Sequence, residues 1–489
     1  MLLVAKWPAY EWTSWIPDHD IYLRNCKVRY ISTRGKSPSL NFEEVLLTGL
    51  APDGGLYIPE TVPQISTAQL QEWKHLGYAE LAFEIVKPFV ADSMPEEDLH
   101  SIINETYSAF SHAEVAPLHT LNDGLYVLEL FHGPTLAFKD FALQLLGRLL
   151  DYFLARRQKH VAILGATSGD TGSAALEGCR HSEFVNMFIL YPHNRVSEVQ
   201  RRQMTTVPGT NVNSMAIEGN FDDCQQLVKK AFSDQSFLPE GYQLVAVNSI
   251  NFSRIMAQIV YYFYAGLKFV DSHEAVSFSV PTGNFGDIYA GYLAKKMGLP
   301  IDRLIIATNK NDILHRFISS NQYQLGQLEP SLSPSMDIMV SSNFERFLYD
   351  LFEGDTSRVE AFVTNLSNNA QQVSEAEWGR AQRVFDSCRV DDEETCAVIK
   401  EVFASDAYIL DPHTATGVKA ARVCCAKSTN PVICLATAHP AKFAEAIERA
   451  GLETPALPSH LADLMTREER TTVLPASLDA VTDFIQNAL

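Results

Sequence analysis

The chain has 489 residues, 46% of them hydrophobic, which is enough to form more than one core. Acidic residues outnumber basic residues by 59 to 39, and the resulting net charge of −20 argues against nucleic acids and anionic membranes as partners. It does not exclude an anionic substrate, because a few local donors outweigh a distant surface charge that salt screens.

The eight cysteines include no C-x-x-C pair and no metal-ligand spacing with the histidines, so we expect reduced thiols, no metal site and a cytoplasmic protein. No apolar run approaches the length of a membrane span, so we expect no membrane contact. Composition adds little to the choice of function beyond these exclusions.

Residues 1–27 are unlike the rest of the chain, because Trp7, Trp12 and Trp15 are three of its five tryptophans. The segment lacks the long apolar stretch of a signal peptide and the Arg/Ser bias of a transit peptide. We expect an atypical, poorly ordered extension, whose deletion leaves activity and melting temperature unchanged.

Helix signals dominate residues 28–115. The spacing of Tyr78, Leu81, Ala82 and Ile85, for example, predicts one apolar helix face.

The next informative stretch, Glu129–Ala142, reads E-L-F-H-G-P-T-L-A-F-K-D-F-A and places Lys139 between a strand-like run and a long amphipathic helix. A lysine beside Phe138 and Phe141 should be partly desolvated, which lowers its pKa and prepares the amine to condense with an aldehyde. The alternative is a lysine whose stem packs while its ammonium stays in water.

Two later segments, His160–Cys179 and Val276–Leu299, each read as a short apolar strand, a Gly-rich loop and a helix. The glycines let backbone amides approach an anion, and the helix directs its unpaired N–H groups at it. Neither loop ends in Gly-Lys-Ser/Thr or has G-x-G-x-x-G spacing, which disfavours an NTPase or a dehydrogenase. The alternative is that both are helix-capping turns of an α/β sheet.

The segment N-S-I-N-F-S-R, which ends at Arg254, gathers amide, hydroxyl and guanidinium groups at a predicted helix start, an arrangement suited to a phosphate. The alternative for Arg254 is a surface arginine paired with a carboxylate. Further along, the strand of Val432–Gly451 ends in a polar turn that contains Thr437 and His439, where ligands collect in open α/β sheets.

Between residues 319 and 341 the chain is polar and contains Pro330 and Pro334, which predicts a long loop or insertion over the site. The sequence S-E-A-E from Ser374 fits a capping box, so we expect a helix with a buried stripe of Trp378, Ala381 and Phe385.

Several motifs stand in a fixed order from Tyr30 onward: Y-I-S-T-R-G, G-L-A-P-D-G-G-L-Y-I-P-E, H-G-P-T-L-A-F-K-D, S-G-D-T-G, N-S-I-N-x-x-R, P-T-G-N-F-G-D and T-A-H-P-A-K-F. In these motifs the chain resembles the threonine synthases, a family of pyridoxal-phosphate enzymes with the tryptophan-synthase-β-like fold. The resemblance implies an α/β protein of PLP-dependent fold type II, with two α/β lobes and a mainly helical N-terminal domain. The expected bounds are 28–115 for the N-terminal domain and 116–489 for the catalytic domain. Within the latter, the smaller lobe takes about 148–244 and the larger lobe 116–147 plus 245–489.

The resemblance also implies the cofactor site. Lys139 would hold the aldehyde of pyridoxal 5'-phosphate as a Schiff base, Phe138 would wall the ring, and Thr437 would face the pyridine nitrogen. The cofactor phosphate would lie in the loop of Gly283, Asn284, Phe285, Gly286 and Asp287.

The implied substrate site has two parts. The substrate carboxylate would bind the loop of Thr167, Ser168, Asp170 and Thr171, and the substrate phosphate would bind Thr171, Asn248, Ser249 and Arg254. A carboxylate at Asp170 would be repelled by the substrate carboxylate, so we expect this side chain to be protonated or turned aside.

The activity implied is the conversion of O-phospho-L-homoserine and water to L-threonine and phosphate, by a monomer or a homodimer. One alternative is a phospholyase that acts on phosphothreonine or phosphoserine and yields a keto acid. Two others are a serine/threonine dehydratase, which would not need Arg254, and a cofactor-binding regulatory protein without turnover.

Overall fold

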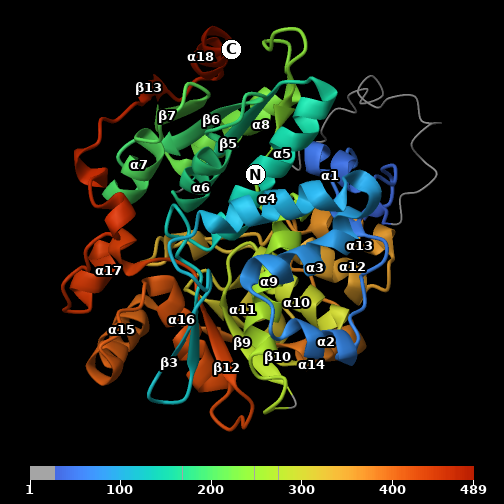
Figure 1. Ribbon diagram of the computed structural model, residues 1–489, viewed down its shortest axis with the longest axis vertical. Helices are drawn as coiled ribbons and strands as arrows, with labels where there is room; N and C mark the ends of the chain where they lie inside the picture. Colours follow the sequence, from blue (N-terminus) through green and yellow to red (C-terminus); the bar gives the residue numbers. More distant parts are fainter. Residues whose placement is uncertain (1–27, 168, 247, 274) are drawn as a thin grey trace.

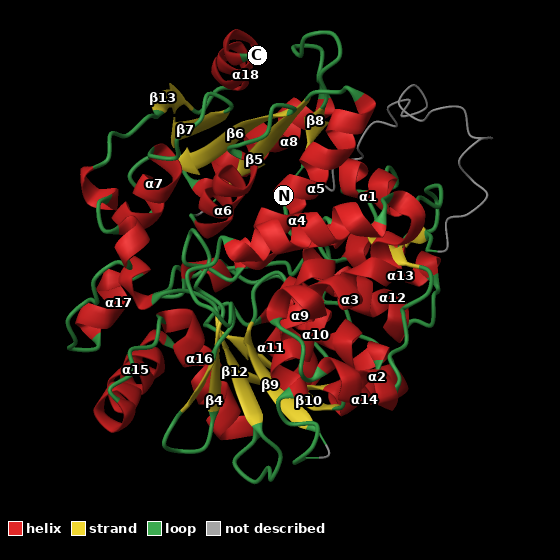
Figure 2. Cartoon of the chain, viewed as in Figure 1, coloured by secondary structure: helices red, strands yellow, loops and turns green. Residues whose placement is uncertain are grey.

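Two mainly parallel sheets, each covered by helices, lie toward opposite ends of the protein (Figures 1 and 2). This computed structural model describes residues 28–167, 169–246, 248–273 and 275–489. The expectations for residues 1–27 and for Ser168 therefore lie outside the described residues.

The six-stranded sheet has the order β11-β10-β9-β12-β4-β3, and only β3 pairs in the antiparallel sense. Its strands are β3 (Leu118–Thr120), β4 (Tyr126–Glu129), β9 (Val276–Pro281), β10 (Ile301–Thr308), β11 (Phe385–Arg389) and β12 (Val432–Ala436). Every residue of the two central strands β9 and β12 is buried, as expected for parallel strands covered on both faces.

Helices from the second half of the chain surround this sheet. They are α9 (Phe252–Leu267), α10 (Gly286–Met297), α11 (Ile313–Ser320), α12 (Phe344–Leu351), α13 (Thr356–Asn365), α14 (Glu375–Val384), α15 (Asp392–Asp406), α16 (Pro412–Cys424) and α17 (Ala444–Arg449). Ser374 and Glu377 form the predicted capping box of α14. We expected Phe385 to belong to that helix, but its backbone pairs with Leu304 and begins β11.

The five-stranded sheet has the order β13-β7-β6-β5-β8, and all its strands are parallel. Its strands are β5 (Val161–Ala166), β6 (Val185–Pro192), β7 (Val212–Glu218), β8 (Leu244–Val245) and β13 (Thr472–Pro475), and its helices are α6 (Asp170–Cys179), α7 (Glu198–Thr205), α8 (Phe221–Ser233) and α18 (Leu478–Ala488).

The C-terminal segment corrects one expected boundary. We expected residues 245–489 to belong to the larger lobe, but β13 pairs with β7 and α18 packs on α8, in the five-stranded half (Figure 1). The physical reason is burial, since Val481 and Ile485 on α18 are fully buried in the core of that half.

The N-terminal region is mainly helical. Its elements are β1 (Tyr30–Ser32), α1 (Phe42–Thr48), β2 (Tyr57–Pro59), α2 (Thr67–Trp73), α3 (Tyr78–Val90) and α4 (Glu96–Ser108). The helix predicted from the Tyr78 spacing is α3, which packs on α9, while α4 packs on α5 (Lys139–Arg157). Helix α5 also packs on α6 and on α9, so it contacts elements of both halves.

Short 3-10 turns complete the fold: η2 (Ala91–Ser93), η3 (Pro334–Met336), η4 (Pro440–Lys442), η5 (Ser459–Leu461) and η6 (Leu464–Thr466). Turn η3 interrupts the irregular stretch between α11 and α12, where the sequence predicts a long loop. No helix of the described residues is both long enough and apolar enough to cross a bilayer.

Candidate active site

Lys139 is the first residue of α5, and groups from distant parts of the chain surround its amine. Its Nζ atom lies 3.3 Å from Asp170 Oδ2 and 3.3 Å from Ser335 Oγ, and 5.6 Å from the centre of the Phe138 ring. The N–H of Phe138 donates to the carbonyl of Thr437 at 2.9 Å. The structure therefore brings together four residues that the sequence assigns to one site, and a fifth, Ser335, from the loop above it.

The environment of Lys139 lowers the pKa of its amine. Burial is the main cause, the carboxylate of Asp170 opposes it, and the positive charges of Lys442 and Arg254 reinforce it. The expected desolvation is present: the Phe138 ring lies beside the amine, while the Phe141 ring packs into the core against Phe110.

Asp170 corrects a second expectation. Its carboxylate is neither turned aside nor protonated, but points into the site and bonds Lys139, Lys442, Gln200 and Ser335. Burial alone would raise the pKa of Asp170, yet the two ammonium groups hold it well below its usual range. The charge of a second lysine, Lys442, which the local sequence does not reveal, therefore stabilises the carboxylate.

The loop that follows β9 has the form expected of an anion seat. A Cβ atom on Gly283 would lie 2.8 Å from the Ser335 carbonyl oxygen, so only glycine fits beneath the η3 turn. Phe285 adopts a left-handed backbone (φ 63°) and ends the loop at the start of α10, which has no side-chain N-cap. The free N–H groups of the first turn of α10 remain available for an anion.

Other residues of this loop hold its shape. The Asn284 carbonyl accepts hydrogen bonds from the backbone and side chain of Asn343 at 3.0 and 3.1 Å, and a Cβ on Gly286 would lie 3.3 Å from the Asn343 amide. Asp287 turns its carboxylate away from the loop, where Oδ1 accepts from Tyr261 at 2.6 Å and from Tyr262 at 2.8 Å. Burial raises the pKa of Asp287 to about 6. Its side chain bonds buried tyrosines and therefore does not contribute to the anion site.

Arg254 lies in the first turn of α9 and is only 5% exposed. Within the part of the chain that the structure describes, its Nε atom has no hydrogen-bond partner and no carboxylate forms an ion pair with it. Burial lowers the pKa of this guanidinium to about 10. The alternative of a surface arginine in a salt bridge is therefore wrong, and a buried guanidinium without a partner is the form an anion site takes.

The remaining predicted substrate residues differ in what they do. The Thr167 hydroxyl accepts the N–H groups of Gly169 and Gly172 at 3.0 and 2.9 Å and so shapes the loop before α6. Ser249 lies 3.4 Å from Ser342, whose hydroxyl donates to Asn284 Oδ1 and so connects the Ser249 and Asn284 segments.

Two of the predicted substrate-binding residues make few contacts with the rest of the site. Thr171 is half-buried in the first turn of α6. Asn248 is exposed, and its side chain accepts the N–H of Ile250 within its own turn.

Three residues of the site were missed by the sequence analysis: Lys442, Gln200 and Ser335. Lys442 stands inside T-A-H-P-A-K-F, directly before a phenylalanine, and that apolar setting was its only signal. Ser335 is held by His413, whose Nε2 accepts the Ser335 N–H at 3.2 Å while Nδ1 faces Asp411 at 2.8 Å. The loop between α11 and α12 is thus anchored over Lys139.

His439 packs beside the site as a neutral side chain. Its ring lies edge-on to Phe131, one ring nitrogen accepts the Ala441 N–H, and burial lowers its pKa to about 4. Among the described residues, no group of three or more His, Cys, Asp or Glu side chains is arranged to hold a metal ion.

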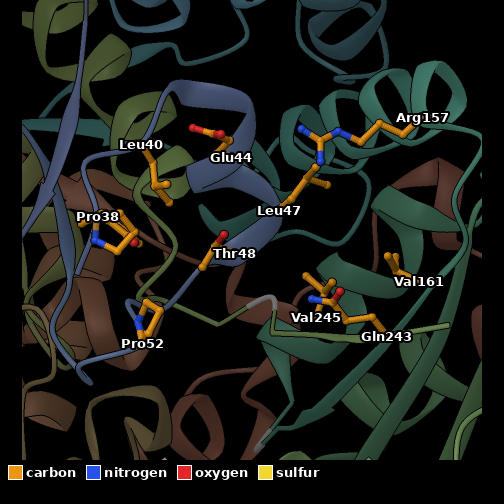
Figure 3. A pocket seen from close by; sticks show the side chains of 11 residues that line it. Pro38, Leu40, Glu44, Leu47, Thr48, Pro52, Arg157, Val161, Gln243 and Val245 are labelled. Carbon is orange, nitrogen blue, oxygen red and sulfur yellow. The ribbon is translucent and has the colours of Figure 1, made fainter. Parts of the chain in front are cut away.

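A separate hollow lies between the N-terminal region and the five-stranded half (Figure 3). Its walls are mostly apolar and include Leu40, Leu47, Pro52, Val161 and Val245. None of the predicted site residues lines it, so it is distinct from the site around Lys139.

The residues around Lys139 fit pyridoxal phosphate. The site offers a buried amine of lowered pKa, a glycine loop that leads into a helix without a side-chain cap and, on Arg254, a buried guanidinium whose Nε has no partner among the described residues. Two helix-covered parallel sheets with such a lysine define a pyridoxal-phosphate-dependent enzyme of fold type II.

Comparisons with known proteins narrow this class to one family. The family descriptions that match are "Threonine synthase N terminus" at residues 29–107, "Pyridoxal-phosphate dependent enzyme" at 112–363 and "Threonine synthase, C-terminal" at 414–485. The threonine synthase of Pseudomonas aeruginosa is 59% identical over 94% of this chain and 98% of its own length.

Solved structures agree with this. The PLP-bound threonine synthase of Brucella melitensis has a TM-score of 0.91 and 47% identity, over 94% of this chain and 99% of its own. The yeast enzyme has a TM-score of 0.89 and 43% identity, over 94% and 98% of the two chains. The chain belongs to the threonine synthase family of pyridoxal-phosphate-dependent lyases.

Proposed function

We propose that this enzyme converts O-phospho-L-homoserine and water to L-threonine and inorganic phosphate. The observation that carries the proposal is Arg254, a buried guanidinium whose Nε has no hydrogen-bond partner among the described residues and whose charge acts on the Lys139 amine. A planar guanidinium binds two phosphate oxygens at once, and a substrate without a phosphate would leave it unsatisfied.

The proposed roles of the other residues follow from their positions. The glycine loop from Gly283 to Asp287 and the first turn of α10 would hold the cofactor phosphate through backbone N–H groups. Phe138 and Thr437 would line the ring, since both belong to the loops that meet at Lys139. Ser249, Asn248, Thr171 and Arg254 would hold the substrate phosphate, and Thr167, Ser168 and Asp170 would form the loop for the substrate carboxylate.

Bound pyridoxal phosphate supplies an electron sink that stabilises negative charge at the substrate Cα. The chain itself supplies the proton transfers, for which the amine of Lys139 is placed at the start of α5 and has a lowered pKa. An amine whose pKa is lowered toward neutrality can both take and return protons near neutral pH.

The proposed reaction balances atom by atom. The Cγ–O bond breaks, and phosphate leaves with the electron pair. Cβ loses one proton and gains the hydroxyl of water, Cγ gains one proton to become a methyl group, and the second proton of water ends on phosphate. Lys139 takes the Cα proton and returns it, and it carries the proton from Cβ to Cγ.

In the proposed reaction, phosphate is held after it has left the substrate, until water has added at Cβ. Arg254 is suited to this task because it belongs to a long buried helix and does not depend on a flexible surface loop. The η3 turn, anchored by His413, would limit the access of bulk water to Lys139.

We also propose a cytoplasmic location and a monomer or homodimer. The seven described cysteines are free thiols, which supports a reducing compartment. Light scattering of the purified chain would give the oligomeric state.

The activity is tested by incubating the purified holoenzyme with O-phospho-L-homoserine while phosphate and amino-acid products are measured together. Equal amounts of phosphate and threonine are expected. Phosphate with 2-oxobutyrate, or reaction with phosphothreonine alone, would move the enzyme to the phospholyases.

A further inference from the structure

Lys442 is a fully buried lysine at the end of the η4 turn, and its side chain has no solvent exposure. Its ammonium lies 2.6 Å from Asp170 Oδ1 and donates to the carbonyl of Thr135 at 2.9 Å. It therefore joins the turn after β12, the start of α6 and the loop before α5. A buried ammonium is stable in such a place only because it is paired and hydrogen-bonded.

The two oxygens of Asp170 serve different partners. Oδ1 accepts from Lys442 and, at 2.9 Å, from Gln200, whereas Oδ2 faces Lys139 and the Ser335 hydroxyl at 3.3 and 3.2 Å. Lys442 is the nearer of the two ammonium groups and the more deeply buried. It is therefore the principal counterion of Asp170.

This arrangement determines the charge that Lys139 experiences. A buried carboxylate 3.3 Å away, with no other counterion, would hold the Lys139 amine in its protonated form. When Lys442 already pairs with that carboxylate, Lys139 is not needed as a counterion and loses its proton more readily.

The other charged groups near these residues do not replace Lys442. Arg254 repels the charge on Lys139 but forms no ion pair with a described carboxylate. Asp140, next to Lys139 in the chain, is occupied by Thr135 and Gln144, and burial raises its pKa to about 6. Ser335, from the loop above, is uncharged.

We propose that Lys442 is a positioning residue: by neutralising Asp170, it leaves the amine of Lys139 free to bind the cofactor and to move protons. The inference rests on the proposed function, because it explains how the lysine of that reaction is kept ready. It assigns Lys442 no contact with substrate.

The test measures Lys139 directly and uses no substrate. The full-length chain, freed of cofactor, is mixed with pyridoxal phosphate at a series of pH values and quenched with borohydride, and the label on Lys139 is quantified by peptide mass spectrometry. The initial rate of labelling follows the fraction of unprotonated amine, so its midpoint on the pH axis reports the pKa of Lys139.

Three variants form a charge cycle. In Lys442→Met the midpoint should rise by at least about one pH unit, with labelling at neutral pH slower by about tenfold or more. In Asp170→Asn it should fall, because Lys442 and Arg254 then repel the amine without opposition. In the double variant it should return to within about half a unit of the parent.

Other outcomes would overturn the proposal. A midpoint unchanged in Lys442→Met would mean that Lys442 only supports the fold, and a double variant displaced as far as the single one would show that its charge does not act through Asp170. If Lys442→Met does not fold, an unchanged midpoint in Asp170→Asn refutes the proposal equally. Lys310→Met is the matched control, because Lys310 pairs with Asp392 at 2.9 Å outside the site, and its midpoint should not move.

A failure of this test is distinguishable from a failure of the proposed reaction. The labelling experiment reports on Lys139 whatever the substrate is, whereas the product assay reports on the reaction whatever sets the pKa of Lys139.

Discussion

Replacing Arg254 with methionine should make the ligand-free protein more stable and the enzyme far less active. Burial lowers the pKa of the guanidinium from its usual range to about 10, and no carboxylate of the described residues pairs with it. A shift of this size corresponds to about 3 kcal/mol of lost stability, and the loss is fully present at neutral pH because the group is protonated below its folded pKa. It would be relieved only as the pH rises through about 10.

Methionine keeps much of the apolar stem and removes the charge, so we expect the free energy of unfolding to rise by about 1 to 3 kcal/mol in the absence of ligands. Under the proposed function, the same change would also remove two charge-assisted hydrogen bonds from Arg254 to the substrate phosphate. At about 1.5 kcal/mol or more each, their loss should lower kcat/KM for O-phospho-L-homoserine at least about 100-fold.

Arg346 provides the matched control. It is also fully buried and also has a pKa lowered to about 10, but its guanidinium donates to the carbonyls of Tyr57 and Ile250 and to Asn343. Arg346→Met leaves those buried acceptors unsatisfied and should lower the free energy of unfolding by several kcal/mol, at about 1 to 3 kcal/mol for each lost partner.

Thermal and urea unfolding of the two cofactor-free variants, together with initial rates of the holoenzymes, test whether Arg254 binds the substrate or stabilises the fold. If Arg254→Met destabilises the protein as much as Arg346→Met does, Arg254 is a structural residue. If it leaves kcat/KM unchanged, Arg254 does not bind the substrate phosphate.

Three further predictions follow from the site. Gly283→Ala should weaken cofactor binding, measured by fluorescence titration, because a Cβ would lie 2.8 Å from the Ser335 carbonyl oxygen. The control variant Gly379→Ala should bind the cofactor normally, because its Cβ would have no neighbour within 4 Å. Asp287→Asn should have a higher Tm than the parent at pH 8, and the difference in Tm should shrink below pH 6. The reason is that the raised pKa of Asp287, about 6, makes the parent protein lose stability as the pH rises through that value. Lys139→Met should bind pyridoxal phosphate without forming a borohydride-reducible bond; any reducible label on that variant would place the attachment elsewhere.

The sequence predicts the parts of the site that a single short segment determines. Lys139, the Gly283 loop and the start of α9 at Arg254 are each defined by glycines, caps and apolar runs within about a dozen residues. Such parts of the site can be predicted from the sequence because the same residues that form the turn also form the site.

Contacts between segments far apart in the chain could not be predicted from the sequence. Nothing near Asp170 predicts Lys442, so the carboxylate was expected to be protonated or turned aside, and nothing near Ser335 predicts its place beside Lys139. The return of β13 to the five-stranded sheet and the switch from helix to strand at Phe385 have the same origin, since tertiary pairing overrides the local pattern.

The most direct test of the account is the product ratio of the purified holoenzyme with O-phospho-L-homoserine. One threonine for each phosphate released, with loss of both in Arg254→Met, is the predicted result. Release of phosphate with a keto acid in place of threonine would contradict it, because water would then not be reaching Cβ while phosphate is held.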